Sequence, residues 1–94
     1  MTLEEFVNEG IRRAREKDYH PTTFLRMRDD YGTVSAIKRL VETGERQSGF
    51  QRLKQLGLLD WSLEAAVLRF PEEPGFTKTT ATYAKARLDG ILDA

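Results

Sequence analysis

The sequence predicts an all-α domain, a compact bundle of five to six short helices around a central hydrophobic helix at residues 61–70. Apolar residues recur at intervals of three and four along most of the chain, whereas the period-two alternation of strands is hard to find. Glycine, proline and capping residues separate these stretches at short intervals. Because ninety-four residues suit one core, residues 1–94 are expected to form a single domain.

The first helix is expected over about residues 3–17, where an apolar stripe follows a capping box formed by Thr2 and Glu5. A second helix is expected after Pro21, whose fixed φ suits the first turn of a helix. Gly32 is expected to end this second helix.

Thr33 is the expected N-cap of a third helix, which Gly44 ends. Ser48 is the expected N-cap of a short fourth helix that runs to Leu56. Gly57 and the apolar residue after it have the composition of a Schellman ending.

Asp60 is the expected N-cap of the central helix, in which apolar residues cover nearly the whole circumference from residue 61 to residue 70. Such a helix is either the buried centre of the fold or the place where the domain meets a partner. The prolines and glycine of residues 71–75 then force a loop. Thr77 caps a last helix, whose expected inward residues include Ala81, Ala84, Leu88, Ile91 and Leu92.

The composition argues against several classes of function. Fifteen basic and fifteen acidic residues cancel, so no global field draws the chain to nucleic acid or to an anionic membrane. The lack of cysteine excludes disulfides, thiolate nucleophiles and cysteine-ligated metals. No apolar run approaches the length of a membrane span, and the start of the chain is unlike a signal peptide. A cytoplasmic protein without a membrane partner is expected.

Caps, turn glycines and core positions follow a recurring pattern over about seventy of the ninety-four residues. The pattern reads Tyr19-x-Pro21-Thr22-x-Phe24-Leu25-x-Met27, a helix around Gly32 to Leu40, Gly49-Phe50-x-x-Leu53, Gly57-x-Leu59-Asp60-x-Ser62-x-Glu64-Ala65-x-Val67-Leu68, and Phe76-Thr77 with Ala84-x-Ala86-Arg87-Leu88. It resembles an uncharacterised family of short bacterial helical domains, found alone or at the end of longer proteins. The resemblance implies a fold and no activity; Trp61 and the insertion at residues 71–75 depart from it.

Three residues are catalytic candidates, namely His20, Asp60 and Glu64. His20 is the single histidine, and it precedes a proline, where a residue tends to be extended and exposed. Asp60 and Glu64 lie four apart and could share a helix face, as paired acids must. Asp60 has a capping role, however, and Glu64 suits the helix dipole and could pair with an arginine. We expect no catalytic residue, no cofactor and no metal, and an enzyme is the second alternative; a deep pocket lined by all three residues would favour it.

DNA binding is the first alternative, because the third and fourth expected helices have the spacing of a helix-turn-helix. The outward side chains of the fourth helix include arginine and glutamine, which can read base edges. An uncompensated basic face would support this alternative, and scattered or acid-paired side chains would oppose it. The candidate nucleic-acid residues are Lys38, Arg39, Arg46, Gln51, Arg52, Lys54 and Gln55.

The leading hypothesis is a small non-catalytic protein–protein interaction domain of a bacterium or phage, of the adaptor or inhibitor type. Its partner is another protein, which the sequence does not identify. Tyrosine and tryptophan are enriched among interface anchors. The candidate interface residues are therefore Tyr19, Tyr31, Trp61 and Tyr83.

Overall fold

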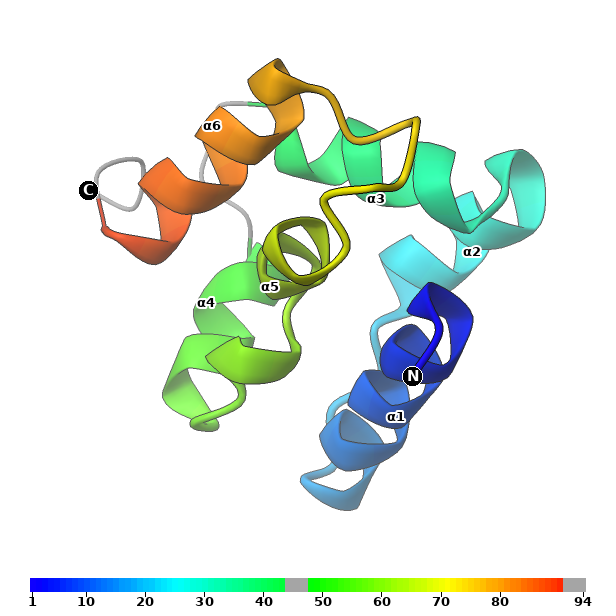
Figure 1. Cartoon of the computed structure of the whole chain (residues 1–94). Helices are drawn as coiled ribbons and strands as arrows, with labels where there is room; N and C mark the ends of the chain where they lie inside the picture. The colour runs from blue at the N-terminus through cyan, green and yellow to red at the C-terminus, as the bar shows by residue number, and fades with distance from the viewer. Residues whose placement is uncertain (44–47, 91–94) are drawn as a thin grey trace.

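The computed structural model describes residues 1–43 and 48–90 (Figure 1). The described part of the chain forms six α-helices and one 3-10 helix and contains no strand, so the all-α prediction is confirmed. The elements are α1 (Leu3–Glu16), α2 (Thr22–Tyr31), α3 (Thr33–Val41), α4 (Ser48–Gln55), η1 (Leu59–Trp61), α5 (Leu63–Arg69) and α6 (Lys78–Leu88).

The capping box predicted for α1 is confirmed. The Thr2 hydroxyl accepts a hydrogen bond from the Glu5 amide at 3.1 Å, and the Glu5 carboxylate accepts one from the Thr2 amide at 2.8 Å. The apolar stripe that follows is buried on one face of the helix, including Phe6 and Val7. α1 therefore contributes one wall of the core.

Thr33 does not cap α3, which corrects the sequence prediction: Gly32 is at the N-cap position and Thr33 is the first helical residue. The Thr33 hydroxyl accepts a hydrogen bond from Arg28 at 2.9 Å and donates one to Glu4 at 3.0 Å. Arg28 also forms an ion pair with Glu4. This cluster ties the start of α1 to the α2–α3 corner, and it directs the Thr33 hydroxyl toward Arg28 and Glu4.

The fourth helix begins at Ser48, and its expected Schellman ending is present. Gly57 has φ 72°, a left-handed value that glycine adopts without strain. The Leu58 amide donates to the Leu53 carbonyl and the Gly57 amide donates to the Lys54 carbonyl, the two bonds that define the motif. The preceding turn at residues 44–47, with its predicted stop at Gly44, lies outside the described residues.

The central helix is shorter than predicted. Leu59–Trp61 forms the separate helix η1, and α5 begins at Leu63. Ser62, and not Asp60, caps α5: its hydroxyl accepts a hydrogen bond from the Ala65 amide at 3.1 Å. The extra turn places Trp61 beside α1, outside the helix that the sequence assigned to it. The central position itself is confirmed, since α5 packs against α1, α3 and α6.

The last helix, α6, closes the bundle over α3 and α5. Thr77 caps it as predicted, with its hydroxyl accepting from the Thr80 amide at 3.4 Å. Its buried face carries Thr80, Ala84 and Arg87, which follow helical spacing. The predicted inward residues Ile91 and Leu92 lie outside the described residues. None of the helices in the described ranges is long and apolar enough to cross a membrane.

Candidate functional site

A groove opens between the α1–α2 corner and α4, with α5 at its base; we call it the central groove. In Figure 1, α1 and α4 descend on opposite sides and α5 lies between them. Its main pocket has a volume of about 280 Å³, and a smaller apolar hollow of about 50 Å³ shares Tyr19, Phe24 and Leu53 with it. The main pocket is lined by Tyr19, His20, Pro21, Thr22, Thr23, Phe24, Leu40, Gly49, Phe50, Leu53, Leu63 and Glu64.

Tyr19 sits at the junction of the two parts of the groove and is half-buried. Its hydroxyl approaches α4 so closely that a Cβ atom at Gly49 would lie 2.9 Å from it. Burial raises the pKa of the Tyr19 phenol, while the nearby Arg52 guanidinium acts in the opposite direction. The ring therefore connects the end of α1 to the α4 wall.

Among the described residues that line the main pocket, Glu64 is the one carboxylate. Its side chain is only 6% exposed, and Arg87 Nη1 lies 3.4 Å from Glu64 Oε2. Burial raises the pKa of Glu64, and the Arg87 guanidinium and a backbone hydrogen bond only partly oppose this rise. The base of a pocket with both polar and apolar lining thus holds a buried carboxylate whose ion-pair partner approaches from outside the lining.

The three catalytic candidates are not brought together. His20 and Glu64 line the same pocket, whereas Asp60 lines a separate hollow together with Trp61. The His20 side chain is 58% exposed and lies 3.9 Å from Asp18. Two carboxylates that face different hollows cannot act as a general acid and base on one substrate.

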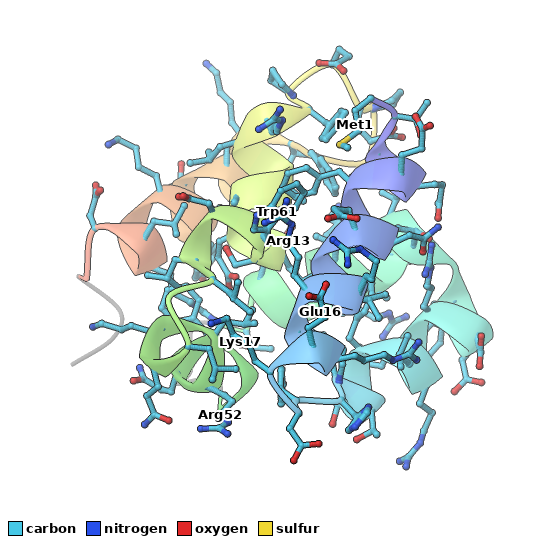
Figure 2. All side chains as sticks on the ribbon, turned by 90° about the horizontal axis from the view of Figure 1, so that it is seen from below. Met1, Arg13, Glu16, Lys17, Arg52 and Trp61 are labelled. Atoms are coloured by element: carbon cyan, nitrogen blue, oxygen red, sulfur yellow. The ribbon has the colours of Figure 1, made fainter. Side chains whose placement is uncertain are left out.

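The smaller apolar hollow runs alongside an aromatic cluster. Phe6 stacks on Trp61 with ring centroids 4.9 Å apart, and Phe70 meets Phe6 edge-on at 5.8 Å. The Arg13 guanidinium lies over the Trp61 ring, 4.5 Å from its centroid. The two side chains are labelled next to each other in Figure 2. Gly10 permits the close approach of η1 to α1, because a Cβ atom at this position would lie 2.9 Å from the Trp61 carbonyl oxygen.

The four interface candidates occupy different surroundings. Tyr19 and Trp61 both line the apolar hollow of the central groove. Tyr31 is exposed at the end of α2, with the Arg39 guanidinium 4.0 Å from its ring centroid. Tyr83 is partly buried against the core from α6. The groove therefore unites two of the four.

The candidate nucleic-acid residues that the structure describes lie on two helices, α3 and α4, that pack against different elements. α4 packs against η1, whereas α3 packs against α2, α5 and α6, unlike the mutually packed pair of a helix-turn-helix. Arg39 is turned toward Tyr31, and Lys38 beside it is half-buried. On α4, Arg52 donates to Gln55 at 3.4 Å. Gln51 is half-buried, Lys54 is exposed and Arg46 lies outside the described residues.

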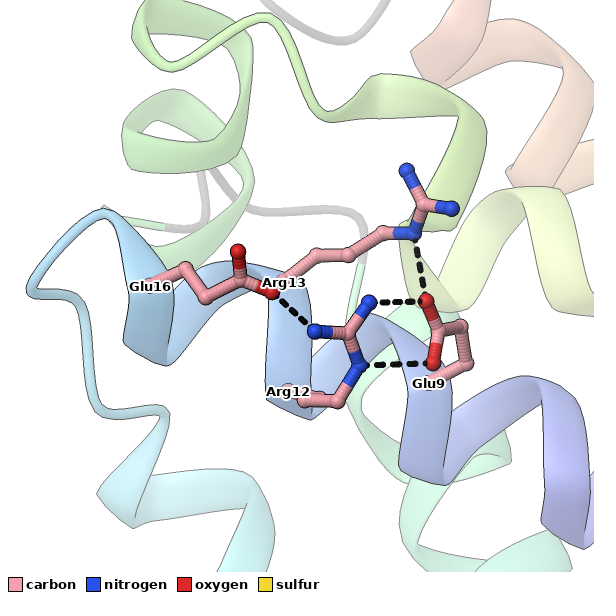
Figure 3. Close-up of polar contacts among 4 residues, drawn as sticks. All are labelled: Glu9, Arg12, Arg13 and Glu16. Carbon is pink, nitrogen blue, oxygen red and sulfur yellow. Dashed lines mark hydrogen bonds and ion pairs between the residues drawn. The ribbon is translucent and has the colours of Figure 1, made fainter.

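The basic run near the end of α1 is largely matched by acids on the same helix (Figure 3). Glu9 accepts hydrogen bonds from Arg12 at 2.7 Å and from Arg13 at 2.8 Å, and Arg12 also pairs with Glu16. The Arg12 guanidinium, followed by that of Arg13, lowers the pKa of Glu9 to about 2. This surface is a network of exposed helical ion pairs.

Two parts of this site were not predicted from the sequence. Arg87 was not identified as buried, although its spacing from Thr80 and Ala84 places it on the inward face of α6. The pocket walls at Leu40 and Leu53 carry ordinary core residues, which give no signal of an opening. Over the described ranges, no group of three His, Asp or Glu side chains is placed to hold a metal ion.

No protein-family model matches this chain, and neither the curated proteins nor the solved structures contain a match.

Proposed function

We propose that this chain is a non-catalytic interaction domain that binds a segment of another protein in the central groove. The observation that carries the proposal is the groove itself, a depression between separate helices that combines a pocket of mixed polarity with a smaller apolar hollow. Tyr19 and Trp61 contribute aromatic surface to it, and such side chains commonly anchor interfaces. An adaptor or an inhibitor in a bacterial or phage system would act through such a site.

The size of the groove is compatible with a short protein segment. Pockets for drug-sized ligands usually measure about 300–1,000 Å³, and the main pocket is just below this range at about 280 Å³. It has room for one or two anchoring side chains. The shallow apolar hollow extends it along α1, so an extended or helical segment could follow the groove.

The arrangement of acids also favours a binding role. Glu64 already faces a buried arginine, and Asp60 lies in another hollow. A carboxylate held in an ion pair is a poor general base unless a ligand displaces its partner. Recognition of a polar group is a simpler use for such a residue.

A peptide selection tests the proposal. Random twelve-residue peptides would be selected on the wild-type domain, and their affinities would then be measured for Leu53→Gln and Leu56→Gln. Both leucines are half-buried on the side of the domain that carries α4, but only Leu53 is among the residues that line the groove. We expect selected peptides to bind Leu53→Gln at least tenfold more weakly and Leu56→Gln with little change.

Circular dichroism would establish that both variants remain helical. The proposal is contradicted if no peptide is enriched, or if the selected peptides bind both variants as tightly as the wild type. A salt-dependent affinity for duplex DNA, with no peptide binding, would favour the nucleic-acid alternative instead.

A further inference from the structure

The charges that line the main pocket are unbalanced, and this points to the chemistry of the occupant. Among the described residues that form the lining, Glu64 is the one acidic side chain and none is lysine or arginine. Its compensating cation, Arg87, is not part of the lining and approaches from α6. A ligand in the pocket would therefore meet the carboxylate and not the guanidinium.

Arg87 does not satisfy the hydrogen-bonding capacity of Glu64. The 3.4 Å separation is an ion pair without a hydrogen bond, because Arg87 Nη1 and Nε have no hydrogen-bond partner. Arg87 Nη2 instead donates to the Val41 carbonyl oxygen at 3.3 Å. An ionised carboxylate can accept about four hydrogen bonds. Glu64 therefore retains acceptor capacity at the base of a pocket that is open to a ligand.

The residues that line the pocket around Glu64 suit a long, unbranched side chain with an apolar stem. Phe24, Phe50, Leu53 and Leu63 contribute apolar residues to the lining, and Thr22 and Thr23 contribute polar ones. A lysine has a four-carbon stem that packs on apolar surface and a compact ammonium with three donors. An arginine presents a wider planar group, and a guanidinium already lies near Glu64.

We infer that the segment bound in the central groove carries a lysine, whose stem packs between the apolar walls and whose ammonium donates hydrogen bonds to the Glu64 carboxylate. This inference rests on the proposed function. A hydrogen bond to a charged group contributes about 1.5–3 kcal/mol, which corresponds to roughly a 10- to 150-fold difference in affinity.

The test uses the tightest selected twelve-residue peptide and copies in which its lysine is replaced by norleucine or by Nε-acetyl-lysine. Norleucine retains the four-carbon stem of lysine and lacks the ammonium charge. Because the changes are made in the peptide, these comparisons need no change in the protein. We expect both replacements to weaken binding to the wild-type domain by at least tenfold. For Glu64→Gln, we expect the advantage of lysine over norleucine to fall below threefold.

Peptides that bind the groove without a lysine, or a norleucine copy that binds as tightly as the lysine peptide, would overturn this inference and leave the proposed function standing. Failure of every peptide to bind the groove would overturn both. Sedimentation of the free domain tests whether a second copy of this chain occupies the groove. A dimer whose formation is blocked by Leu53→Gln would identify that copy as the occupant and overturn the inference.

Discussion

Replacing Arg87 by methionine should destabilise the domain in a strongly pH-dependent manner. The substitution retains a long apolar side chain but removes the cation 3.4 Å from Glu64. With only 6% of its side chain exposed, Glu64 can then either stay charged without a partner or take up a proton. Protonation of Glu64 limits the loss of folding free energy, because a neutral carboxyl is tolerated in a buried site.

The magnitude follows from the ordinary Glu pKa of 4.5, which applies to the unfolded chain. Taking up a proton at pH 7 costs about 3.4 kcal/mol, at about 1.36 kcal/mol for each pH unit above that value. At pH 5 the same step costs about 0.7 kcal/mol. Loss of the hydrogen bond to the Val41 carbonyl adds about 1 kcal/mol at both pH values.

The direction of the Glu64 pKa shift sets the sign of the pH dependence of stability. Burial raises the pKa of Glu64 in the folded state, so the folded state holds the proton more tightly than the unfolded chain. The stability that this group contributes is present below pH 4.5 and is lost as pH rises toward the folded-state pKa. Without Arg87 this rise in pKa is larger, so the variant should lose more stability between pH 5 and pH 7 than the wild type.

Urea unfolding followed by the fluorescence of Trp61, the single tryptophan, measures the effect. The reasoning is refuted if Arg87→Met loses the same free energy of unfolding at pH 5 and pH 7. The double variant Glu64→Met with Arg87→Met is the control. It should recover most of the loss at pH 7 and remove the added pH dependence, because replacing both members of a buried pair is often neutral.

Two further substitutions test the packing around η1. Gly10→Ala should destabilise the fold by about 1–2 kcal/mol, because the new Cβ would lie 2.9 Å from the Trp61 carbonyl oxygen and this overpacking outweighs the gain in helix propensity. Thermal unfolding measures this loss of stability, and Arg15→Ala, at an exposed position of the same helix, is the control. A Gly10→Ala variant as stable as the wild type would contradict the close contact. Ser62→Ala should cost about 1 kcal/mol through loss of the cap on the Ala65 amide, and an unchanged urea midpoint would argue against that cap.

The fold was accessible from the sequence because its signals are local. Capping by Thr2 and Thr77 and the Schellman ending at Gly57 each depend on a few neighbouring residues, and each is present. Asp60 was misassigned because Asp60 and Ser62 are both good N-caps, and the choice between them depends on tertiary packing. That packing holds Trp61 against Phe6 in a separate turn.

The candidate site was less accessible, because it depends on where helices leave space. Apolar periodicity identifies inward residues but does not distinguish a filled core from an open groove, so Leu40 and Leu53 appeared as ordinary core positions. Glu64 stood out as a charged residue in the first turn of the central helix. Its partner Arg87 lies twenty-three positions away on another helix, and no local pattern connects the two.

Paramagnetic broadening by a spin-labelled peptide tests the central claim most directly. The tightest selected peptide, with a nitroxide at one end, would be added to the 15N-labelled domain, and amide signals would be compared before and after reduction of the label. Binding in the central groove predicts the strongest broadening at the amides of Tyr19, Phe24 and Gly49, with weaker broadening near Tyr31 and Tyr83. Broadening centred on Tyr31, or spread evenly over the domain, would contradict the account.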